Sequence, residues 1–354
     1  MIDLDDAEAI RAADPSAMLD AIAGLPEQVR LGYSAGRSTA DLPHVDDVSA
    51  VAFCGMGGSG FAGEIVRAVF RDRLGVPFEV IRGPELPAYA GRGTLVMCCS
   101  YSGNTAETIA CFEEALARGS RMMAVAGGGE LAGRAARSRV ALVPAPPGLM
   151  PRAAVGHLAF GVLGALEAPG LGLVPSLDGD VREVISVLEG LARRLGPEAP
   201  LDENLAKLLA ARMRGRLPVI WGAEGIGAAA AARWKTQLNE NAKTPAFWAT
   251  LPELDHNEVV GWSEGAGEAA FLVALRTSEE QGEVAERFPP SIDIARSSGA
   301  EVQQVEAAGR TPLAQLFSLI MTGDFVSCYL ALLRGFDPTP VEAIDSLKRA
   351  LESA

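Results

Sequence analysis

The sequence predicts an α/β fold with two doubly wound domains, in which helices cover both faces of a parallel sheet. Short apolar segments alternate with longer segments of helical pattern, and continuously apolar strands are typical of sheets that are buried on both sides. A glycine-rich loop follows one apolar segment in each half of the chain. The chain has 354 residues, which is long enough for two domains of ordinary size.

The first half of the chain is expected to form a helical extension and then the first domain. Residues 1–40 have the pattern of acidic, capped helices, and the domain is expected to span 41–168. Apolar runs bounded by turn residues predict its strands at 49–55, 76–83, 94–100, 121–128 and 139–145. Helices are predicted from about Gly60, near 105–118 and over 151–167, where Pro151 occupies the first turn.

The second domain is expected to span 180–354. The segment APGLGLVPSLDGD interrupts the alternation, so the boundary is placed near 168–180. Strands are predicted at 217–225, 269–276 and 300–306. Helices are predicted near 180–195, 201–215, 226–241, 279–298 and 311–334, and from about 340 to the end.

The two glycine loops indicate that one α/β domain has been duplicated. The segments CGMGGSG (54–60) and WGAEGIG (221–227) carry glycines at matching positions. They differ at the loop tip, because Ser59 in the first segment corresponds to Ile226 in the second. If one copy binds an anion, we therefore expect it to be the first.

Composition and charge exclude several classes of function. The formal net charge of −14 repels nucleic-acid phosphate at long range, so no nucleic-acid partner is expected. Five cysteines without a CxxC spacing are expected to be buried core residues of a reducing compartment. The N-terminus lacks the pattern of a signal peptide, and no apolar stretch is expected to approach the ~20 uncharged residues of a membrane span. These features predict a cytoplasmic protein with no membrane partner.

The loop GMGGSG also fits the fingerprint of a dinucleotide-binding fold. Glu79 follows it at roughly the spacing, ~20 residues, of an acid that binds ribose. However, Glu79 is expected inside the second strand, whereas a ribose would lie beyond the strand end. A dinucleotide-dependent oxidoreductase is thus disfavoured but stays open.

A second loop, SYSGNTAET (100–108), favours a phosphate monoester as the ligand. It places three hydroxyl groups where a helix begins, and helix N-termini present free N–H groups and the positive end of the helix dipole. The alternative is that these hydroxyls only cap the helix, as Thr105 is able to do. The proposed phosphate site consists of Gly57, Gly58, Ser59, Ser100, Ser102 and Thr105.

Four charged or titratable residues suit the transfer of a proton alpha to a carbonyl group. Glu240, between two asparagines, is a candidate general base, and His256 is able to move protons near neutral pH. Arg152 is a candidate for stabilising an oxyanion, and Lys348 lies on the last helix. This chemistry requires no cofactor and no metal. Taken singly, each of these residues has a structural alternative as a surface charge, a helix cap or a salt-bridge partner.

The motifs together resemble those of the bifunctional phosphoglucose/phosphomannose isomerases. These are two-lobed members of the sugar-isomerase (SIS) fold in the phosphoglucose isomerase superfamily, and the resemblance runs from about residue 45 to 350. It implies that both domains are SIS-type domains. The motifs that carry the resemblance are GMGGSG, SYSGNT, PRAA, NENAK, HNE and the C-terminal LK.

The resemblance also implies a role for each site residue. Gly58, Ser59 and the hydroxyls of the second loop would hold the sugar phosphate, and Glu240 would shuttle a proton between C1 and C2. Arg152 would stabilise the cis-enediolate, while His256 and Lys348 would help to open the sugar ring. Family members are dimers, which implies that His256 reaches its site across the subunit interface.

The leading hypothesis is a metal-independent aldose–ketose isomerase of hexose 6-phosphates. It would interconvert glucose 6-phosphate and/or mannose 6-phosphate with fructose 6-phosphate through a cis-enediol. One alternative is a catalytically silent sugar-phosphate regulator, which would need the phosphate loops but not the base. Another is an amino-sugar 6-phosphate isomerase, whose phosphate site would be the same.

Overall fold

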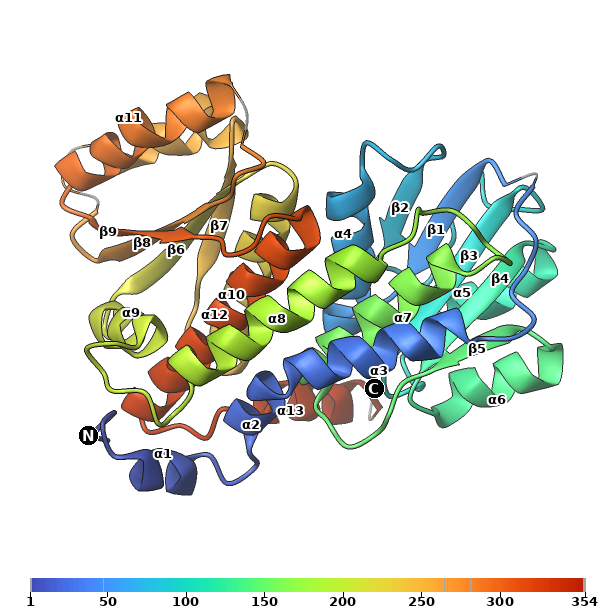
Figure 1. The fold of residues 1–354 in the computed structure, drawn as a ribbon, viewed down its shortest axis with the longest axis horizontal. Coiled ribbons are helices and arrows are strands. Elements are labelled where there is room, and N and C mark those ends of the chain that lie inside the picture. The colour runs from blue at the N-terminus through green and yellow to red at the C-terminus, as the bar shows by residue number, and fades with distance from the viewer. Residues whose placement is uncertain (1, 47, 264, 266, 281, 353–354) are drawn as a thin grey trace. The chain divides into compact units, whose positions relative to one another are not determined.

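A computed structural model describes residues 2–46, 48–263, 265, 267–280 and 282–352 (Figure 1). The chain divides into two compact units. The N-terminal unit comprises Gly24–Glu189 and Gly309–Gln315, and the C-terminal unit comprises Met1–Ala23, Gly190–Ala308 and Leu316–Ala354. The helices α8 (Asp178–Leu195) and α12 (Pro312–Leu333) contribute residues to both units.

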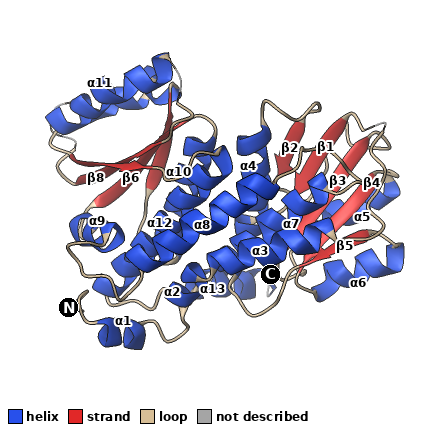
Figure 2. Cartoon of the chain, in the orientation of Figure 1, coloured by secondary structure: helices blue, strands red, loops and turns tan. Residues whose placement is uncertain are grey.

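The N-terminal unit contains a parallel sheet whose strands follow the order β2-β1-β3-β4-β5 (Figure 2). All five predicted strands are confirmed. They are β1 (Ala50–Cys54), β2 (Phe78–Ile81), β3 (Thr94–Ser100), β4 (Arg121–Ala126) and β5 (Ala141–Pro144). The strands β1 and β3 are buried throughout because helices pack on both faces.

Two groups of helices cover the two faces of this sheet. The helices α5 (Ala106–Ala117) and α6 (Gly129–Ser138) share a core cluster with one face. The helices α3 (Leu25–Arg37), α4 (Gly57–Phe70) and α7 (Val155–Glu167) pack on the other face. Helix α6 was not predicted, because its glycine-rich sequence resembles a loop.

The C-terminal unit contains a second parallel sheet with the order β7-β6-β8-β9. The strands are β6 (Leu217–Ala223), β7 (Phe247–Leu251), β8 (Ala270–Arg276) and β9 (Glu301–Glu306). Strand β7 was not predicted, because it lies in a segment dominated by polar residues. It is an edge strand, and its first two residues, Phe247 and Trp248, are exposed.

The second sheet is also covered on both faces. Helix α11 (Glu283–Ser297) and the 3-10 turns η2 (Glu253–His256) and η3 (Glu258–Trp262) pack on one face, and α10 (Ile226–Glu240) packs on the other. The remaining helices are α1 (Ala7–Ala13), α2 (Met18–Ala23), α9 (Leu205–Met213) and α13 (Glu342–Glu352). The last helix was predicted to continue to residue 354, but residues 353–354 lie outside the described part of the chain.

The two sheets support the predicted duplication. In the first sheet, β1 precedes the glycine loop and lies between β2 and β3. In the second sheet, β6 precedes the glycine loop and lies between β7 and β8. In both loops the first and the last of the matched glycines also approach each other closely. A Cβ atom at Gly60 would lie 2.4 Å from the Gly55 carbonyl oxygen, and one at Gly222 would lie 2.4 Å from the Gly227 oxygen. Only glycine tolerates these contacts.

One helix bears on the expectation about membrane spans. By length and composition alone, α12 could cross a membrane, since its most apolar window has a mean hydropathy of 1.8. That window is 94% buried within the protein, as is usual for the core helix of a soluble protein. Its Asp324 pairs with Arg233 of α10 in a buried ion pair of 2.7 Å. All five cysteines are buried, as predicted, and none forms a disulfide bond.

The compact units divide the chain differently from the expected domains. Residues 1–23 and 24–40 fall in different units, and the units divide between residues 189 and 190. The domain limits 1–40, 41–168 and 180–354 therefore stay a prediction.

Candidate functional site

Two helix N-termini lie at adjacent strand ends in the N-terminal unit. Strands β1 and β3 are neighbours, with Cys54 paired to Cys98, and helices α4 and α5 begin in the loops that follow them. Their N-cap residues, Met56 and Thr105, make no side-chain capping hydrogen bond. Both helix ends are therefore suited to donate backbone hydrogen bonds to a bound anion.

The hydroxyl of Ser59 joins the two loops. Ser59 is 5% exposed, and its Oγ accepts a hydrogen bond of 3.0 Å from the backbone N of Tyr101. Because Tyr101 follows the last residue of β3, this bond fixes the first turn of α4 against the second loop. The predicted proximity of the two loops is confirmed.

Ser100 and Thr105 form a pair within the second loop. Their hydroxyl oxygens lie 2.8 Å apart, and the backbone N of Gly103 donates to Ser100 Oγ at 3.1 Å. Thr105 is half-buried and bonds Ser100 instead of the N–H groups of α5. The alternative in which Thr105 serves only as a helix cap is therefore wrong. Ser102 is exposed, and its Oγ accepts from the backbone N of Asn104 at 3.3 Å.

A glycine brings Arg152 against the same loop. A Cβ atom at Gly58 would lie 2.9 Å from the carbonyl oxygen of Pro151 and 3.0 Å from the Cα of Arg152. Only a glycine allows this approach, which sets Arg152 beside the first turn of α4. The predicted helix over 151–167 instead begins with the 3-10 turn Pro151–Ala153, and the Arg152 in that turn is 3% exposed.

The N-terminal unit thus contains all the predicted phosphate-binding residues and Arg152. Gly57 opens α4 with a φ of +51°, which glycine adopts at no steric cost. The position of Glu79 opposes a dinucleotide site. Glu79 lies in the middle of β2, pairs with Ala52 and accepts a hydrogen bond of 2.7 Å from the hydroxyl of Tyr89.

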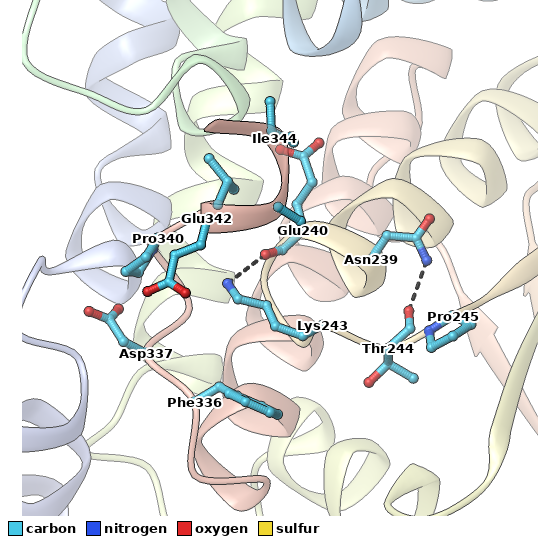
Figure 3. A pocket seen from close by; sticks show the side chains of 12 residues that line it. Asn239, Glu240, Lys243, Thr244, Pro245, Phe336, Asp337, Pro340, Glu342 and Ile344 are labelled. Atoms are coloured by element: carbon cyan, nitrogen blue, oxygen red, sulfur yellow. Dashed lines mark hydrogen bonds between the residues drawn. The ribbon is translucent and has the colours of Figure 1, made fainter. Parts of the chain in front are cut away.

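Glu240 lines a pocket of about 710 Å³ in the C-terminal unit (Figure 3). The pocket lies between the C-terminal end of α10 and the segment that leads into α13. Glu240 is the last residue of α10 and is half-buried. The other described residues that line the pocket are Asn239, Lys243, Thr244, Pro245, Phe336, Asp337, Pro340, Val341, Glu342, Ala343 and Ile344.

The wall around Glu240 is largely apolar and suits a general base. Figure 3 shows Ile344 near the Glu240 carboxylate and the segment from Asp337 to Pro340 along one side. A carboxylate partly shielded from water can accept a proton from a bound substrate. The segment 337–343 contributes five residues to the pocket lining.

Lys243 is a pocket residue that was assigned no role from the sequence. Its Nζ donates to the backbone oxygen of Glu240 at 2.7 Å and to that of Pro338 at 2.9 Å. Pro338 lies 95 residues further along the chain, so no local pattern indicates this contact. The motif NENAK, which contains Lys243, is the sequence feature that could have identified this residue.

His256 is an exposed residue at the end of η2. The residues around it are anchored. The carboxylate of Asp255 accepts from Ser291 Oγ at 2.7 Å and from Arg287 at 3.2 Å, and Glu258 Oε1 accepts from the indoles of Trp221 and Trp262. The HNE motif therefore holds His256 on a fixed turn. His256 is not among the described residues that line the Glu240 pocket.

Lys348 is an exposed residue of α13. It lies four residues after Ile344, which lines the pocket, so both lie on the same face of the helix. The structure thus places Glu240, His256 and Lys348 in the C-terminal unit, and the phosphate loops and Arg152 in the N-terminal unit. Within the described parts of the chain, no three His, Cys, Asp or Glu residues are grouped as metal ligands.

Comparisons with known proteins show the family to which the chain belongs. Residues 202–351 match the sequence model of a family described as "Bacterial phospho-glucose isomerase C-terminal SIS domain". The bifunctional phosphoglucose/phosphomannose isomerase of Caldicellulosiruptor bescii is 36% identical over 336 residues, which cover 94% of this chain and 98% of the relative. The Aquifex aeolicus protein of the same name is 34% identical and covers 85% of this chain and 90% of its own.

A solved structure shares the fold. It is described as a glucose-6-phosphate isomerase-like protein from Thermus thermophilus, and the two chains match with a TM-score of 0.65 over 99% of each. Their sequences are 21% identical, so this likeness supports the architecture of two SIS-type domains and nothing further.

Proposed function

The chain belongs to the bifunctional phosphoglucose/phosphomannose isomerase family, and we propose that it interconverts glucose 6-phosphate and mannose 6-phosphate with fructose 6-phosphate. The observation that carries the proposal is the pairing of a phosphate-binding architecture with a shielded carboxylate. The loops of the N-terminal unit suit one phosphate monoester, and Glu240 lines a pocket with largely apolar walls.

In the proposed mechanism, the phosphate is held by the N-termini of α4 and α5 and by the hydroxyls beside them. Glu240 removes the proton at C2 of the open-chain aldose, and the electrons form a cis-enediolate. The same residue returns the proton at C1, while the proton of the C2 hydroxyl moves to the oxygen at C1, so that the hydroxyl at C1 and the carbonyl at C2 of the ketose result. The buried guanidinium of Arg152 stabilises the negative charge of the enediolate.

His256 and Lys348 are proposed to open the sugar ring before proton transfer. Opening requires a proton at the ring oxygen and removal of one from the anomeric hydroxyl, and both residues are exposed groups able to exchange protons. We further propose that His256 performs this step in the neighbouring subunit of a cytoplasmic homodimer. Its exposure and its absence from the described lining of the Glu240 pocket support this arrangement.

One site is able to serve both sugars because they differ only in configuration at C2. That carbon becomes planar in the enediol, so both aldoses give the same intermediate. Discrimination then depends on the face from which the proton returns. We propose that neither step requires a metal ion, since the base and the oxyanion-binding cation are both supplied by the chain.

The test is to incubate the purified protein, with EDTA, with each aldose phosphate in ²H₂O. Proton transfer through the base would form fructose 6-phosphate with deuterium at C1, detected by NMR. Absence of turnover with both aldoses would reject the proposal, and deuterium at C1 would distinguish proton transfer through a base from a direct hydride shift. Turnover of glucosamine 6-phosphate alone would favour the amino-sugar alternative.

A further inference from the structure

We propose that Lys243 is a positioning residue for Glu240, a role that rests on the proposed function of Glu240 as the base. Lys243 follows the end of α10 by three residues and has a φ of +52°. This left-handed conformation is unfavourable for any residue with a Cβ atom, and glycine or asparagine usually occupies it. A lysine at this position has a side chain able to make contacts that glycine lacks.

The side chain supplies two hydrogen bonds to backbone oxygens. The Nζ donates to the backbone oxygen of Glu240 at 2.7 Å, a bond drawn in Figure 3, and to the backbone oxygen of Pro338 at 2.9 Å. The last carbonyl groups of a helix have no partner within the helix. Lys243 therefore satisfies the carbonyl of the residue that carries the proposed base.

The same ammonium group joins Glu240 to the segment before α13. Pro338 lies in this segment, and residues on both sides of it line the pocket. One side chain thus fixes the backbone on two walls of the pocket. A base must be held within a fraction of an ångström of the proton that it removes, because a misplacement of ~1 Å can cost ~100-fold in rate.

The charge of Lys243 also opposes the charge of its surroundings. The described lining of the pocket contains three carboxylates, Glu240, Asp337 and Glu342, and Lys243 is the single cation in that lining. The C-terminal end of α10 adds the negative end of a helix dipole. The ammonium group therefore offsets a local excess of negative charge around the base.

Arg334 provides a matched control because its side chain binds the same turn. Its Nη1 donates to the backbone oxygen of Ala242 at 2.7 Å and to that of Lys243 at 2.9 Å. It thus fixes the turn after α10 as Lys243 does, but it is not among the described residues that line the pocket. If Lys243 only stabilised the fold, substitution of Lys243 and substitution of Arg334 would have the same effects on activity and stability.

The experiment compares Lys243→Met with Arg334→Met in steady-state assays of the full chain. Methionine keeps the length and the backbone strain of lysine but lacks the ammonium. We expect Lys243→Met to lower kcat by about 10- to 100-fold while KM for the sugar phosphate changes less than about threefold. We expect Arg334→Met to lower the thermal midpoint while kcat and KM stay close to wild type.

A second variant guards against misfolding. Lys243→Gly fits the left-handed backbone, so the fold should survive, and added ethylammonium is expected to restore part of kcat. Equal losses of kcat in the Met variants, or no rescue of a folded Lys243→Gly, would overturn the role of Lys243. An inactive wild type would instead overturn the proposed function, and the positioning role with it.

Discussion

The two glycine loops have the same backbone design but present different side chains. After β1, the loop places Ser59 in the first turn of α4, where its hydroxyl binds the neighbouring loop at Tyr101. After β6, the corresponding residue is Ile226, which is 4% exposed and packs into the core. We therefore expect the Ser59 hydroxyl, and not the shape of the turn, to determine whether a loop binds an anion.

The loops that follow β3 and β8 also differ in the groups that they present. After β3, the loop offers the paired hydroxyls of Ser100 and Thr105. After β8, the carboxylate of Glu280 accepts from the backbone N of Thr277 at 2.7 Å and from Arg276 at 2.8 Å, with 2% of the Glu280 side chain exposed. In the second copy, this loop thus binds a carboxylate of the chain itself, that of Glu280. In the first copy, the corresponding loop is proposed to bind the phosphate of the substrate.

In the proposed function, the two copies of the duplicated domain divide the chemistry. One copy keeps the phosphate loops at the N-termini of its helices. The other uses the C-terminal end of α10, where Glu240 lies. The following predictions test this division, from the largest expected effect to the smallest.

Removing the proposed base should have the largest effect. Glu240→Gln keeps the size of the side chain but cannot accept the proton, so we expect kcat to fall by about 10²- to 10⁴-fold. The coupled assay for fructose 6-phosphate measures this, and the thermal midpoint serves as the control for folding. A variant with wild-type kcat would place the base elsewhere.

Breaking the buried ion pair should affect the stability of the C-terminal unit. Arg233 and Asp324 make two hydrogen bonds, of 3.1 and 2.7 Å, in a site that is almost fully buried. Asp324→Asn leaves a buried guanidinium without its counter-charge and should cost about 3–5 kcal/mol in urea unfolding.

The control for this prediction is an exposed ion pair. Asp293 pairs with Arg296 at 3.3 Å, with side chains 71% and 51% exposed. Asp293→Asn should change stability by less than about 1 kcal/mol. Equal effects of the two substitutions would show that α10 does not depend on its buried pair.

The hydroxyl at the loop tip should matter in only one copy. Ser59→Ala is expected to raise KM for the sugar phosphate by about 10- to 100-fold, since a hydrogen bond to a charged group contributes about 1.5–3 kcal/mol. The reciprocal change, Ile226→Ser, should lower stability and leave KM unchanged. An increase in KM for Ile226→Ser would mean that the second loop also binds substrate.

A buried histidine should make the N-terminal unit sensitive to acid. His157 is 7% exposed, and burial lowers the pKa of His157 from its usual 6.5. Its contribution to stability is therefore present above pH 6.5 and is lost as the pH falls through the lowered value. Urea unfolding between pH 5 and 8 should show this loss, and His157→Gln should reduce it. An equal slope in both proteins would assign the acid sensitivity to other groups.

Sequence reasoning succeeded where the signal was local. The apolar strands, the glycine loops and the Ser-Thr loop were all identified, because each depends on neighbouring residues. Strand β7 was missed because it is a half-exposed edge strand in a polar segment, and periodicity is weak in such strands. Lys243 was missed because its partner Pro338 is distant in sequence.

The anchoring of Glu258 gives the protein an intrinsic optical probe. Its carboxylate accepts from two indoles, Trp221 at 2.8 Å and Trp262 at 3.3 Å, whose rings meet edge-on at 5.5 Å. Indole emission responds to nearby charge and to hydrogen bonding at the ring nitrogen. Any movement of the turn that carries His256 should therefore change tryptophan fluorescence, so that motion at this turn can be followed during turnover without an attached label.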